Sequence, residues 1–443
     1  MKIGFVSLPV TGHLNAMTAL ARKLQSRGHD VVFIGVPDAG ASVRAANLRF
    51  ESYCEREFPA GSVAEIYGPH SRLCGLEVMK RQAEEISPRF LKAGLKHLPR
   101  KLKETGVEAV VLDAAHILLQ LVPISLGIPF AQIWTNVHLD FSGATPLTFF
   151  GWPHQTTAEA RARNLEGVRI LTGFLGPAGA VAQAYAKENG MQIDLSNQST
   201  TSSKLAVISQ TPKEFDFEGA PRPAHFYYAG PFHDDDGREP VAFPWEKLTG
   251  EPLIYASLGT LVNGQPQIFR TILGAVARLK GFQVVLSAGK SVNQNELGSI
   301  PANTLVVRSA PQIELLKRAV LCITHAGLNT TLESLSQGVP LVAIPIGYDQ
   351  PGVGARIVHH GVGETVTIED LSIERLSQLI GKVLDTRTYR DRAHYFQRVI
   401  AGTHGLDLAA GVVERVFARE LYGAHQNVPW WSRPIEVSDN YLR

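Results

Sequence analysis

Residues 309–350 contain the side chains whose types and order could bind an anion and a sugar. A short apolar run at residues 320–323 leads into the sequence THAGLNT at residues 324–330, and helix-compatible residues follow up to position 337. This order predicts a buried strand, a tight turn and a helix start. Amide groups at a helix start lack partners inside the helix, and the helix dipole adds partial positive charge there. A phosphate is therefore favoured in front of residues 327–330.

Several side chains of this turn could contact such a ligand. Gly327 lets the backbone approach the anion closely, because glycine has no side chain. His325, Asn329 and Thr330 could donate hydrogen bonds to phosphate oxygens. Glu333 lies about one helical turn further on and could accept hydrogen bonds from a neutral polyol such as ribose. A strand-to-helix turn with glycine and asparagine is common by itself, so the order and spacing carry the information.

A second pair of residues could remove a proton from an alcohol, for which a histidine with a pKa near neutrality is suited. His13 follows the apolar run at residues 3–8, at the loop where open α/β sheets bind ligands. Asp113 follows the apolar run at residues 109–112. Position alone leaves a structural role open, because each residue could simply cap the end of its element.

The alternation of apolar runs with helical patterns predicts an α/β fold with two doubly wound, Rossmann-like domains. We expect residues 1–232 to form the N-terminal domain, 233–250 a linker, 251–423 the C-terminal domain and 424–443 a tail. Residues 145–204 lose the alternation, which predicts either short helices and loops that form a pocket wall or an ordinary helical insertion. The first loop carries Gly12 and His13 in place of the pattern GxGxxG, which argues against a dinucleotide dehydrogenase.

Predicted strands of the N-terminal half lie at residues 3–8, 31–36, 109–112 and 130–134, with helices at 13–28 and 117–126. Predicted strands of the C-terminal half lie at residues 253–257, 283–286, 305–307, 320–324 and 341–344, with helices at 267–279, 313–318, 328–337 and 406–421. The polar sequence HDDDGREP at residues 233–240 marks the linker, and its aspartate run is interpreted as solvated.

Composition excludes several classes of protein. The 443 residues suffice for two domains, and a net charge of +2 with 19% charged residues gives no basic field for nucleic acid. The three cysteines are too few and too scattered for a disulfide framework or a zinc cluster, so we expect no metal site and a reducing compartment. A signal-peptide pattern and an apolar run of about 20 residues are both lacking, which favours a cytoplasmic protein.

The sequence at residues 309–350 resembles the donor-binding signature of the family-one UDP-glycosyltransferases. The matching residues are the Pro-Gln pair at 311–312, HAGLNTTLE at 325–333, GVP at 338–340 and DQ at 349–350. Ser309 departs from the family pattern, in which an aromatic residue is common. Ala326 and Leu328 stand where plant members usually carry Cys and Trp. Leu328 and residues 349–357 look more like the bacterial branch, and particularly like zeaxanthin glucosyltransferases.

The resemblance implies the GT-B fold, in which two Rossmann-like domains face each other across a cleft. It implies transfer of a hexose from a UDP-sugar co-substrate to an alcohol, with inversion at the anomeric carbon and without a metal or other cofactor. His13 would be the general base, and Asp113 would fix its tautomer and stabilise the imidazolium. The helix amides and His325 would stabilise the departing diphosphate. The tail, with the sequence VPWW at residues 428–431, would cross back to the N-terminal domain.

The remaining contacts are assigned by matching family positions. Thr260 matches a diphosphate contact, Gln312 a uridine contact and Thr135 a sugar contact. Asp349 and Gln350 match positions that hold sugar hydroxyls. The full expected donor-binding set is Gly12, Thr135, Gly259, Thr260, Ser309, Ala310, Gln312, His325, Gly327, Leu328, Asn329, Thr330, Glu333, Asp349 and Gln350.

The expected donor is UDP-glucose, because Gln350 closes the signature and, in related plant enzymes, Gln at this position often accompanies glucose. The expected acceptor is a small hydrophobic hydroxylated molecule such as a terpenoid, a carotenoid or a phenol, and the expected state is a monomer. Ser309 cannot stack on uracil as an aromatic residue does. Arg308 could, but strand alternation turns it to the opposite face unless the turn has already begun.

Three other functions stay open. One is a transferase that acts on a lipid-linked or membrane-associated acceptor, with peripheral membrane contact through the basic run at residues 92–103. The others are a UDP-sugar epimerase or hydrolase, and a binding module for nucleotide sugars without catalysis. The basic run is more simply explained as a solvated helix face.

Overall fold

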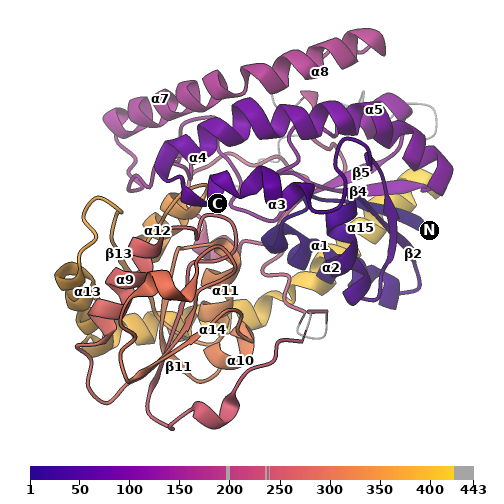
Figure 1. Ribbon diagram of the computed structural model, residues 1–443. Helices are drawn as coiled ribbons and strands as arrows, with labels where there is room; N and C mark the ends of the chain where they lie inside the picture. Colours follow the sequence, from indigo (N-terminus) through magenta and orange to yellow (C-terminus); the bar gives the residue numbers. More distant parts are fainter. Residues whose placement is uncertain (196–199, 235–236, 239, 424–443) are drawn as a thin grey trace.

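The computed structural model describes residues 1–195, 200–234, 237–238 and 240–423. Two parallel sheets, each covered by helices, form two α/β domains (Figure 1). The first sheet has the order β3-β2-β1-β4-β5-β6-β7, and the second has the order β10-β9-β8-β11-β12-β13. The predicted fold class of two doubly wound domains is confirmed.

The N-terminal domain is built around a seven-stranded sheet. Its strands are β1 (Lys2–Val6), β2 (Asp30–Gly35), β3 (Arg49–Ser52), β4 (Ala109–Asp113), β5 (Phe130–Trp134), β6 (Val207–Ser209) and β7 (Phe226–Tyr228). Its helices are α1 (Thr11–Ser26), α2 (Gly40–Ala45), α3 (Ser62–Tyr67), α4 (Gly75–Arg81), α5 (Ser87–Thr105), α6 (Leu121–Leu126), α7 (Ala158–Phe174) and α8 (Gly176–Glu188). The central strands are buried on both faces, which explains their near-continuous apolar sequences.

The C-terminal domain is built around a six-stranded sheet. Its strands are β8 (Leu253–Ser257), β9 (Gln283–Ser287), β10 (Thr304–Val307), β11 (Ala319–Thr324), β12 (Leu341–Ala343) and β13 (Gly363–Thr365). Its helices are α9 (Pro266–Val276), α10 (Gln312–Leu316), α11 (Leu328–Ser336), α12 (Gln350–His359), α13 (Ile373–Asp385) and α14 (Arg387–Thr403), and the chain then continues into α15 (Gly405–Tyr422).

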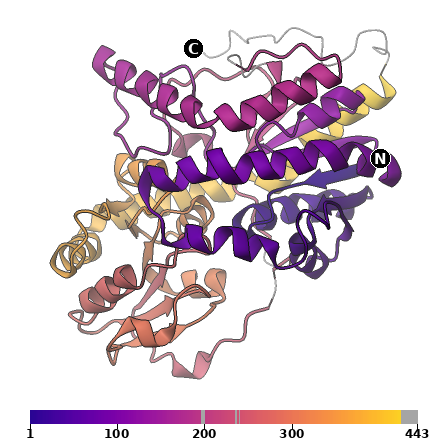
Figure 2. The ribbon, with the colours of Figure 1, turned by 45° about the horizontal axis from the view of Figure 1, so that its top comes forward.

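Of the two alternatives for residues 145–204, the helical insertion is confirmed, and the short helices and loops are wrong where α7 and α8 form. The chain there forms two long helices, α7 and α8, which lie outside α5 (Figure 2). Thr157 caps the start of α7 by accepting a hydrogen bond from the amide of Ala160 at 3.2 Å. Ala178 and Ala182 of α8 pack into the core cluster that includes residues of α5. Small residues on the packing face gave these helices little apolar periodicity.

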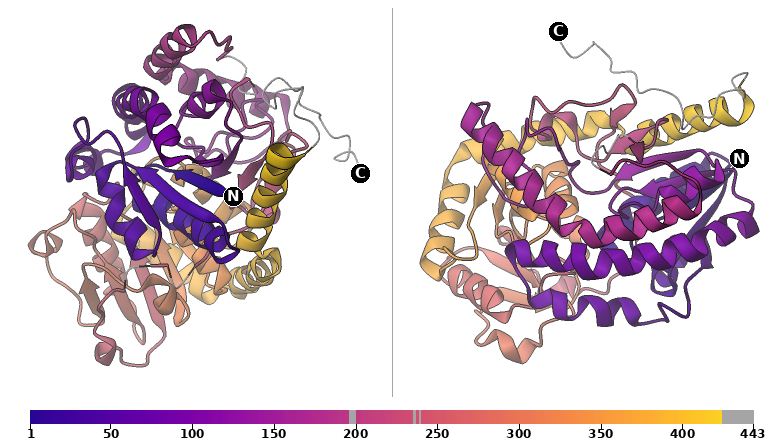
Figure 3. Two further views of the ribbon diagram at one scale, coloured as in Figure 1. Left: turned by 90° about the vertical axis from the view of Figure 1, so that its right-hand side faces the viewer. Right: turned by 90° about the horizontal axis from the view of Figure 1, so that it is seen from above.

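The last described helix, α15, packs on the N-terminal domain (Figure 3). Val413 and Phe417 belong to the same core cluster as Phe5 of β1. Arg27, which follows the last residue of α1, forms ion pairs with Asp407 at 2.6 Å and Glu414 at 2.8 Å. The predicted C-terminal domain at 251–423 therefore ends too late, because the return to the N-terminal domain comes with α15. The tail at 424–443, including residues 428–431, lies outside the described residues, as do residues 235–236 of the linker's aspartate run.

A segment of the N-terminal domain crosses in the opposite direction. Val78 of α4 is fully buried in the core cluster of the C-terminal domain. The amide of Gly75 donates to the carbonyl of Ile346 at 2.7 Å, and the amide of Gly264 donates to the carbonyl of Ser71 at 2.9 Å. Backbone hydrogen bonds and apolar burial therefore join the two domains at α4.

A buried ionic cluster makes a further contact between the domains. Arg356 of α12 lies 2.7 Å from Asp216, which follows β6, and Arg222 lies 2.9 Å from the other oxygen of Asp216. Tyr228 donates its hydroxyl to Asp216 at 2.8 Å. Burial alone would raise the pKa of Asp216, but the two guanidinium groups outweigh burial and hold the pKa well below its usual range.

Asp216→Asn should therefore destabilise the protein by roughly 3–5 kcal/mol, because it leaves two buried guanidinium groups without a counter-charge. Urea denaturation at pH 7 should show a lower midpoint. The difference from wild type should shrink below about pH 4, where the unfolded Asp216 takes up a proton and the folded one does not.

The control is Glu374→Gln, which breaks the exposed Arg278–Glu374 pair and should leave the urea midpoint nearly unchanged, because solvent screens an exposed ion pair. If Asp216→Asn unfolds at the same urea concentration as the control variant, Asp216 does not stabilise the interface between the domains.

Candidate active site

The parallel sheet of the N-terminal domain brings His13 and Asp113 together. Strand β1 pairs with β4, so the loop after β1 and the end of β4 meet at the same edge of the sheet. His13 lies in the first turn of α1, and Asp113 is the last residue of β4. His13 Nδ1 lies 2.8 Å from Asp113 Oδ2. The Asp113 side chain is fully buried, whereas that of His13 is 21% exposed.

The oxygens of Asp113 are held by further donors. Ser7 donates its hydroxyl to Oδ2 at 2.9 Å, and the amide of Ala115 donates to Oδ1 at 3.1 Å. The Thr135 hydroxyl lies 2.7 Å from His13 Nδ1 and donates to Asp113 Oδ1 at 3.3 Å. Thr135, expected to contact the sugar, is thus engaged with the histidine–carboxylate pair. Ser7 was missed because a serine at a strand end carries no distinctive signal.

Nearby charges and burial shift the pKa values of His13 and Asp113 in opposite directions. Burial lowers the pKa of His13, but the charge and hydrogen bond of Asp113, with a smaller contribution from Asp349, leave that pKa raised. Burial raises the pKa of Asp113, yet His13 and the donors around the carboxylate leave it lowered. An ionised carboxylate only accepts hydrogen bonds, so it holds the proton on His13 Nδ1 and makes Nε2 the proton-accepting nitrogen.

Helix α11 of the C-terminal domain begins beside this pair. Its N-cap is Gly327, which as a glycine has no side chain to cap the first amides. Asn329 Nδ2 donates to the carbonyl of Gly12 at 2.7 Å, although the two residues lie 317 positions apart. The predicted anion site at residues 327–330 and the predicted base at His13 therefore lie next to each other. The side chain of Leu328 is buried in the core, so only its backbone can contribute there.

His325 lies between two glycines at the base of this turn. A Cβ atom at either Gly259 or Gly327 would clash with its imidazole ring, and Gly259 also has a φ of +72°. Burial lowers the pKa of His325 to about 4. The ring is therefore neutral at pH 7, so it can offer a hydrogen bond but not the positive charge of an imidazolium. Thr260, which follows Gly259, is exposed.

Predicted nucleotide contacts form a connected group. Gln312 Nε2 donates to Glu333 Oε2 at 2.6 Å and to Thr330 Oγ1 at 3.2 Å, and Tyr255 donates to Gln312 Oε1 at 3.1 Å. Arg238, from the linker, forms an ion pair with Glu333. Burial raises the pKa of Glu333, but Arg238 and other partners leave it lowered, so Glu333 is ionised. Sequence reasoning missed Arg238 because the linker was interpreted as solvated.

The remaining predicted residues lie at element ends. Gln350 Oε1 accepts from the amides of Ile346 and Gly347 at 2.9 and 3.0 Å, so this side chain stabilises its own loop. Asp349 is the N-cap of α12, and burial is the main cause of its raised pKa.

At the end of β10, Arg308 and Ser309 are both exposed and form a bend, and Ala310 packs on a small core cluster. The strand ends at Val307. Arg308 therefore lies outside the strand, and the alternation of side chains along a strand does not turn it away from a bound base.

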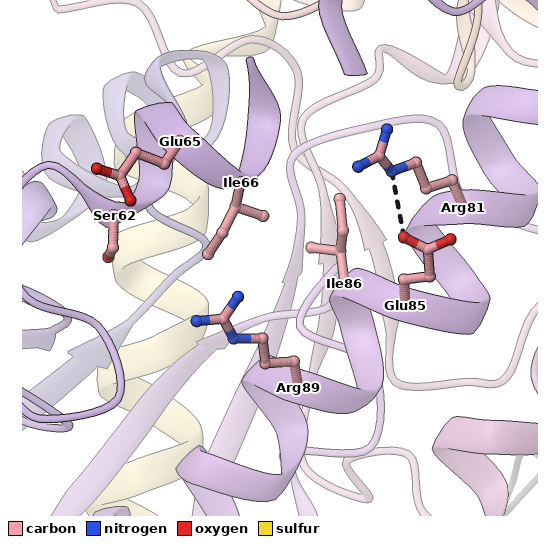
Figure 4. Close-up of a pocket in the computed structure, with 7 residues that line it drawn as sticks. All are labelled: Ser62, Glu65, Ile66, Arg81, Glu85, Ile86 and Arg89. Atoms are coloured by element: carbon pink, nitrogen blue, oxygen red, sulfur yellow. Dashed lines mark ion pairs between the residues drawn. The ribbon is translucent and has the colours of Figure 1, made fainter. Parts of the chain in front are cut away.

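A groove of about 300 Å³ lies between α3 and the segment that joins α4 to α5 (Figure 4). Its lining is largely charged, and Arg81 is paired with Glu85 across 3.3 Å. The lining residues are Ser62, Glu65, Ile66, Arg81, Glu85, Ile86 and Arg89. None of the predicted site residues lines this groove, and its charge differs from the apolar pocket expected for the acceptor.

Three residues with metal-binding side chains also lie close together. The ligand atoms of Cys54, Glu57 and His97 lie within 4.8 Å of one another. Each already has a protein partner: Glu57 lies 2.7 Å from His97 Nε2 and 3.3 Å from Lys96, and Cys54 donates to the carbonyl of Ala93 at 3.4 Å. Burial raises the pKa of the Cys54 thiol to about 12. These contacts describe an ion-pair cluster on the surface next to α5.

Comparison with known proteins identifies glycosyltransferases as similar in sequence and fold. Residues 239–432 match the family described as UDP-glucoronosyl and UDP-glucosyl transferase. Zeaxanthin glucosyltransferase of Pantoea ananas is 27% identical over 412 residues, which cover 93% of this chain and 95% of that protein. The NDP-glycosyltransferase YjiC of Bacillus subtilis (strain 168) is 24% identical over 93% of this chain and 96% of that protein.

Solved structures share the fold over nearly the whole length. The glycotransferase of kitacinnamycin has a TM-score of 0.70 at 22% identity and covers 94% of this chain and 98% of its own. The glycosyltransferase VinC in complex with DTDP has a TM-score of 0.68 at 17% identity, over 95% of this chain and 100% of its own. The chain is thus an enzyme of the GT-B glycosyltransferase class, which transfers a sugar from a nucleotide sugar. Within that class, its C-terminal half resembles the family-one UDP-glycosyltransferases. Among the described residues, no helix is long and apolar enough to cross a membrane.

The pKa of His13 tests the geometry of the site directly. Imidazole NMR titration should give a pKa above 6.5 in the wild type, because Asp113 and Asp349 outweigh burial. Asp113→Asn should bring that pKa below 6.5, because burial remains while the main negative charge is lost. His325 is the internal control, with a pKa of about 4 in both proteins. A His13 pKa that does not change in Asp113→Asn would contradict the pairing.

Proposed function

We propose that this enzyme transfers glucose from UDP-glucose to a hydroxyl group of a small hydrophobic acceptor, with inversion and without a metal ion. The observation that carries the proposal is the contact between Asn329 and Gly12 at 2.7 Å, which places the uncapped start of α11 beside the His13 loop. A site for the leaving diphosphate and a base for the attacking alcohol are therefore adjacent.

The proposed reaction is a single displacement. The acceptor hydroxyl gives its proton to His13 Nε2 while its oxygen forms a bond to the anomeric carbon. The bond from that carbon to the UDP oxygen breaks on the opposite face, so the configuration inverts. Asp113 stabilises the imidazolium that forms. Backbone amides at the start of α11 stabilise the negative charge that develops on the leaving diphosphate.

Support for the donor and the acceptor comes from different features. The family match over residues 239–432 and the group of Gln312, Thr330 and Glu333 support a UDP-sugar. Gln350 favours glucose. The relatives named zeaxanthin glucosyltransferase favour a hydrophobic acceptor, which we extend to terpenoids, carotenoids and phenols. A cytoplasmic monomer is the state in which we expect the enzyme to act.

The function is tested by incubating the purified protein with UDP-glucose, UDP-galactose, UDP-GlcNAc or TDP-glucose and a panel of hydroxylated acceptors. Mass spectrometry should detect a glucoside, with UDP-glucose the fastest donor. His13→Ala should lower turnover with an alcohol by a factor of about 10² or more, because it removes the general base. Its affinity for UDP, measured by calorimetry, should stay near that of the wild type.

His97→Ala is the matched control, because His97 pairs with Glu57 away from this site. Wild-type turnover of an alcohol by His13→Ala would exclude the proposed base. A several-fold faster reaction with another donor would overturn the donor assignment, and free sugar or an epimer without a glycoside would indicate a hydrolase or an epimerase.

Uracil recognition is tested at the exposed bend after β10. Ser309→Trp should tighten UDP binding by up to about tenfold, or ~1.4 kcal/mol, because a ring at this position can stack on the base. Calorimetry with UDP measures the effect, and Ser309→Leu controls for added apolar area. If Ser309→Trp binds no better than wild type while Arg308→Ala loses a comparable amount, Arg308 is the stacking platform and the assignment of Ser309 is wrong.

A further inference from the structure

Gln210 connects the base to the donor-binding helix, although no catalytic motif includes it. It follows the last residue of β6 directly, and only 2% of its surface is exposed. Its side-chain nitrogen donates to the backbone carbonyl of Thr135 and, at 2.9 Å, to Asn329 Oδ1. The first bond stays within the N-terminal domain, and the second crosses to the C-terminal domain.

Asn329 completes the connection with the other half of its amide. Its Oδ1 accepts from Gln210, and its Nδ2 donates to the carbonyl of Gly12 at 2.7 Å. Only one orientation of the Asn329 amide satisfies both partners, because Gln210 offers a donor and Gly12 an acceptor. The Asn329 side chain therefore links the two domains by hydrogen bonds. Its place in the signature had instead predicted a hydrogen bond to the donor phosphate.

The hydrogen bonds and short stretches of chain close into a ring. Gly12 is followed directly by His13, whose Nδ1 lies 2.7 Å from the Thr135 hydroxyl. Thr135 in turn offers its backbone carbonyl to Gln210. The ring therefore contains the base, its hydroxyl partner and the first turn of the helix that faces the diphosphate.

We propose that Gln210 is a positioning residue that fixes the distance between His13 and the start of α11. The proposal rests on the proposed function, because it assigns those two parts to one reaction. In-line displacement requires the acceptor oxygen to be aligned with the anomeric carbon and the leaving oxygen. A misplacement of about 1 Å can lower the rate about 10²-fold. The packing of α4 and α15 joins the domains as a whole, and Gln210 sets the local alignment of the two loops by holding the Asn329 amide that bonds Gly12.

The test measures kcat and binding separately. Gln210→Ala should lower kcat for transfer to an alcohol about tenfold, while the affinity for UDP changes less than about twofold, because the amides that face the diphosphate are intact. Asn329→Ala should act in the same direction. The double variant should be little worse than either single one, because residues that act through one ring do not contribute additively.

Gln210→Glu should be at least as slow as Gln210→Ala. A carboxylate cannot donate, so it would face two oxygens, the Thr135 carbonyl and Asn329 Oδ1. Turning the Asn329 amide would relieve one contact only by bringing its oxygen against the carbonyl of Gly12. A role in packing alone would predict the reverse order, because Glu retains the size of Gln.

Gln283→Ala is the matched control for the loss of a buried glutamine. Gln283 is 6% exposed and uses both ends of its amide, accepting from Thr249 at 2.8 Å and donating to the carbonyl of Lys247 at 2.8 Å, in the C-terminal domain. This variant should lose stability without the tenfold loss in kcat. Equal kcat losses in Gln210→Ala and Gln283→Ala would reduce Gln210 to a structural role and overturn the proposal.

A second readout does not depend on activity. Hydrogen exchange at the amides of residues 12–14 should quicken in Gln210→Ala and in Asn329→Ala, but not in Gln283→Ala. If the wild type forms no glycoside with any donor, the proposed function fails while this exchange pattern still reports on the ring. Unchanged exchange in both ring variants, or additive kcat losses in the double variant, would overturn the proposal.

Discussion

A charged carboxylate buried at the end of β4 is the constraint on which the site depends. Burial disfavours the ionised form of Asp113, so the surrounding structure must supply compensating partners. Those partners come from the loop after β1, the residues after β4 and the loop after β5. Because β1, β4 and β5 are neighbours in one parallel sheet, their carboxyl ends converge at a single edge. The sheet order thereby decides that His13 meets a carboxylate.

The second constraint is the join between the domains. Val78 of α4 is buried in the C-terminal core, whereas Phe417 of α15 is buried in the N-terminal core. Asp216 and Arg356 add a charged contact between the domains. The interface between the domains thus involves several elements. The position of α11 beside the His13 loop therefore does not depend on the linker alone. Helix α11 and His13 are parts of one packed assembly.

The sequence predicted the elements better than the contacts. Strands such as β5 and β8 were predicted with their observed ends, because strands buried on both faces are short apolar runs bounded by turn residues. Helices α7 and α8 were expected only as one of two alternatives, because small residues on their packing faces weaken the helical pattern. The sequence predicted α15 as an apolar helix, but its apolar residues do not indicate on which of the two domains the helix packs.

At the site, too, residues in motifs could be predicted from the sequence, whereas residues that act through distant contacts could not. His13, Asp113 and the turn at residues 325–330 could be named from motif and family resemblance, and the structure brings them together. Gln210 and Arg238 could not be named. Each matters only through a partner about 95 to 120 positions away, Glu333 for Arg238 and Asn329 for Gln210, and a lone Gln or Arg in a polar stretch has many ordinary roles.

A crystal structure with a stable analogue of UDP-glucose, such as the 2-deoxy-2-fluoro compound, tests the central claim most directly. The claim is that the start of α11 and His13 act on one bound sugar nucleotide. The diphosphate oxygens should lie within hydrogen-bond distance of the amides at residues 327–330, with the anomeric carbon on the side of His13 Nε2. A diphosphate bound away from α11, or an anomeric carbon facing away from His13, would contradict it.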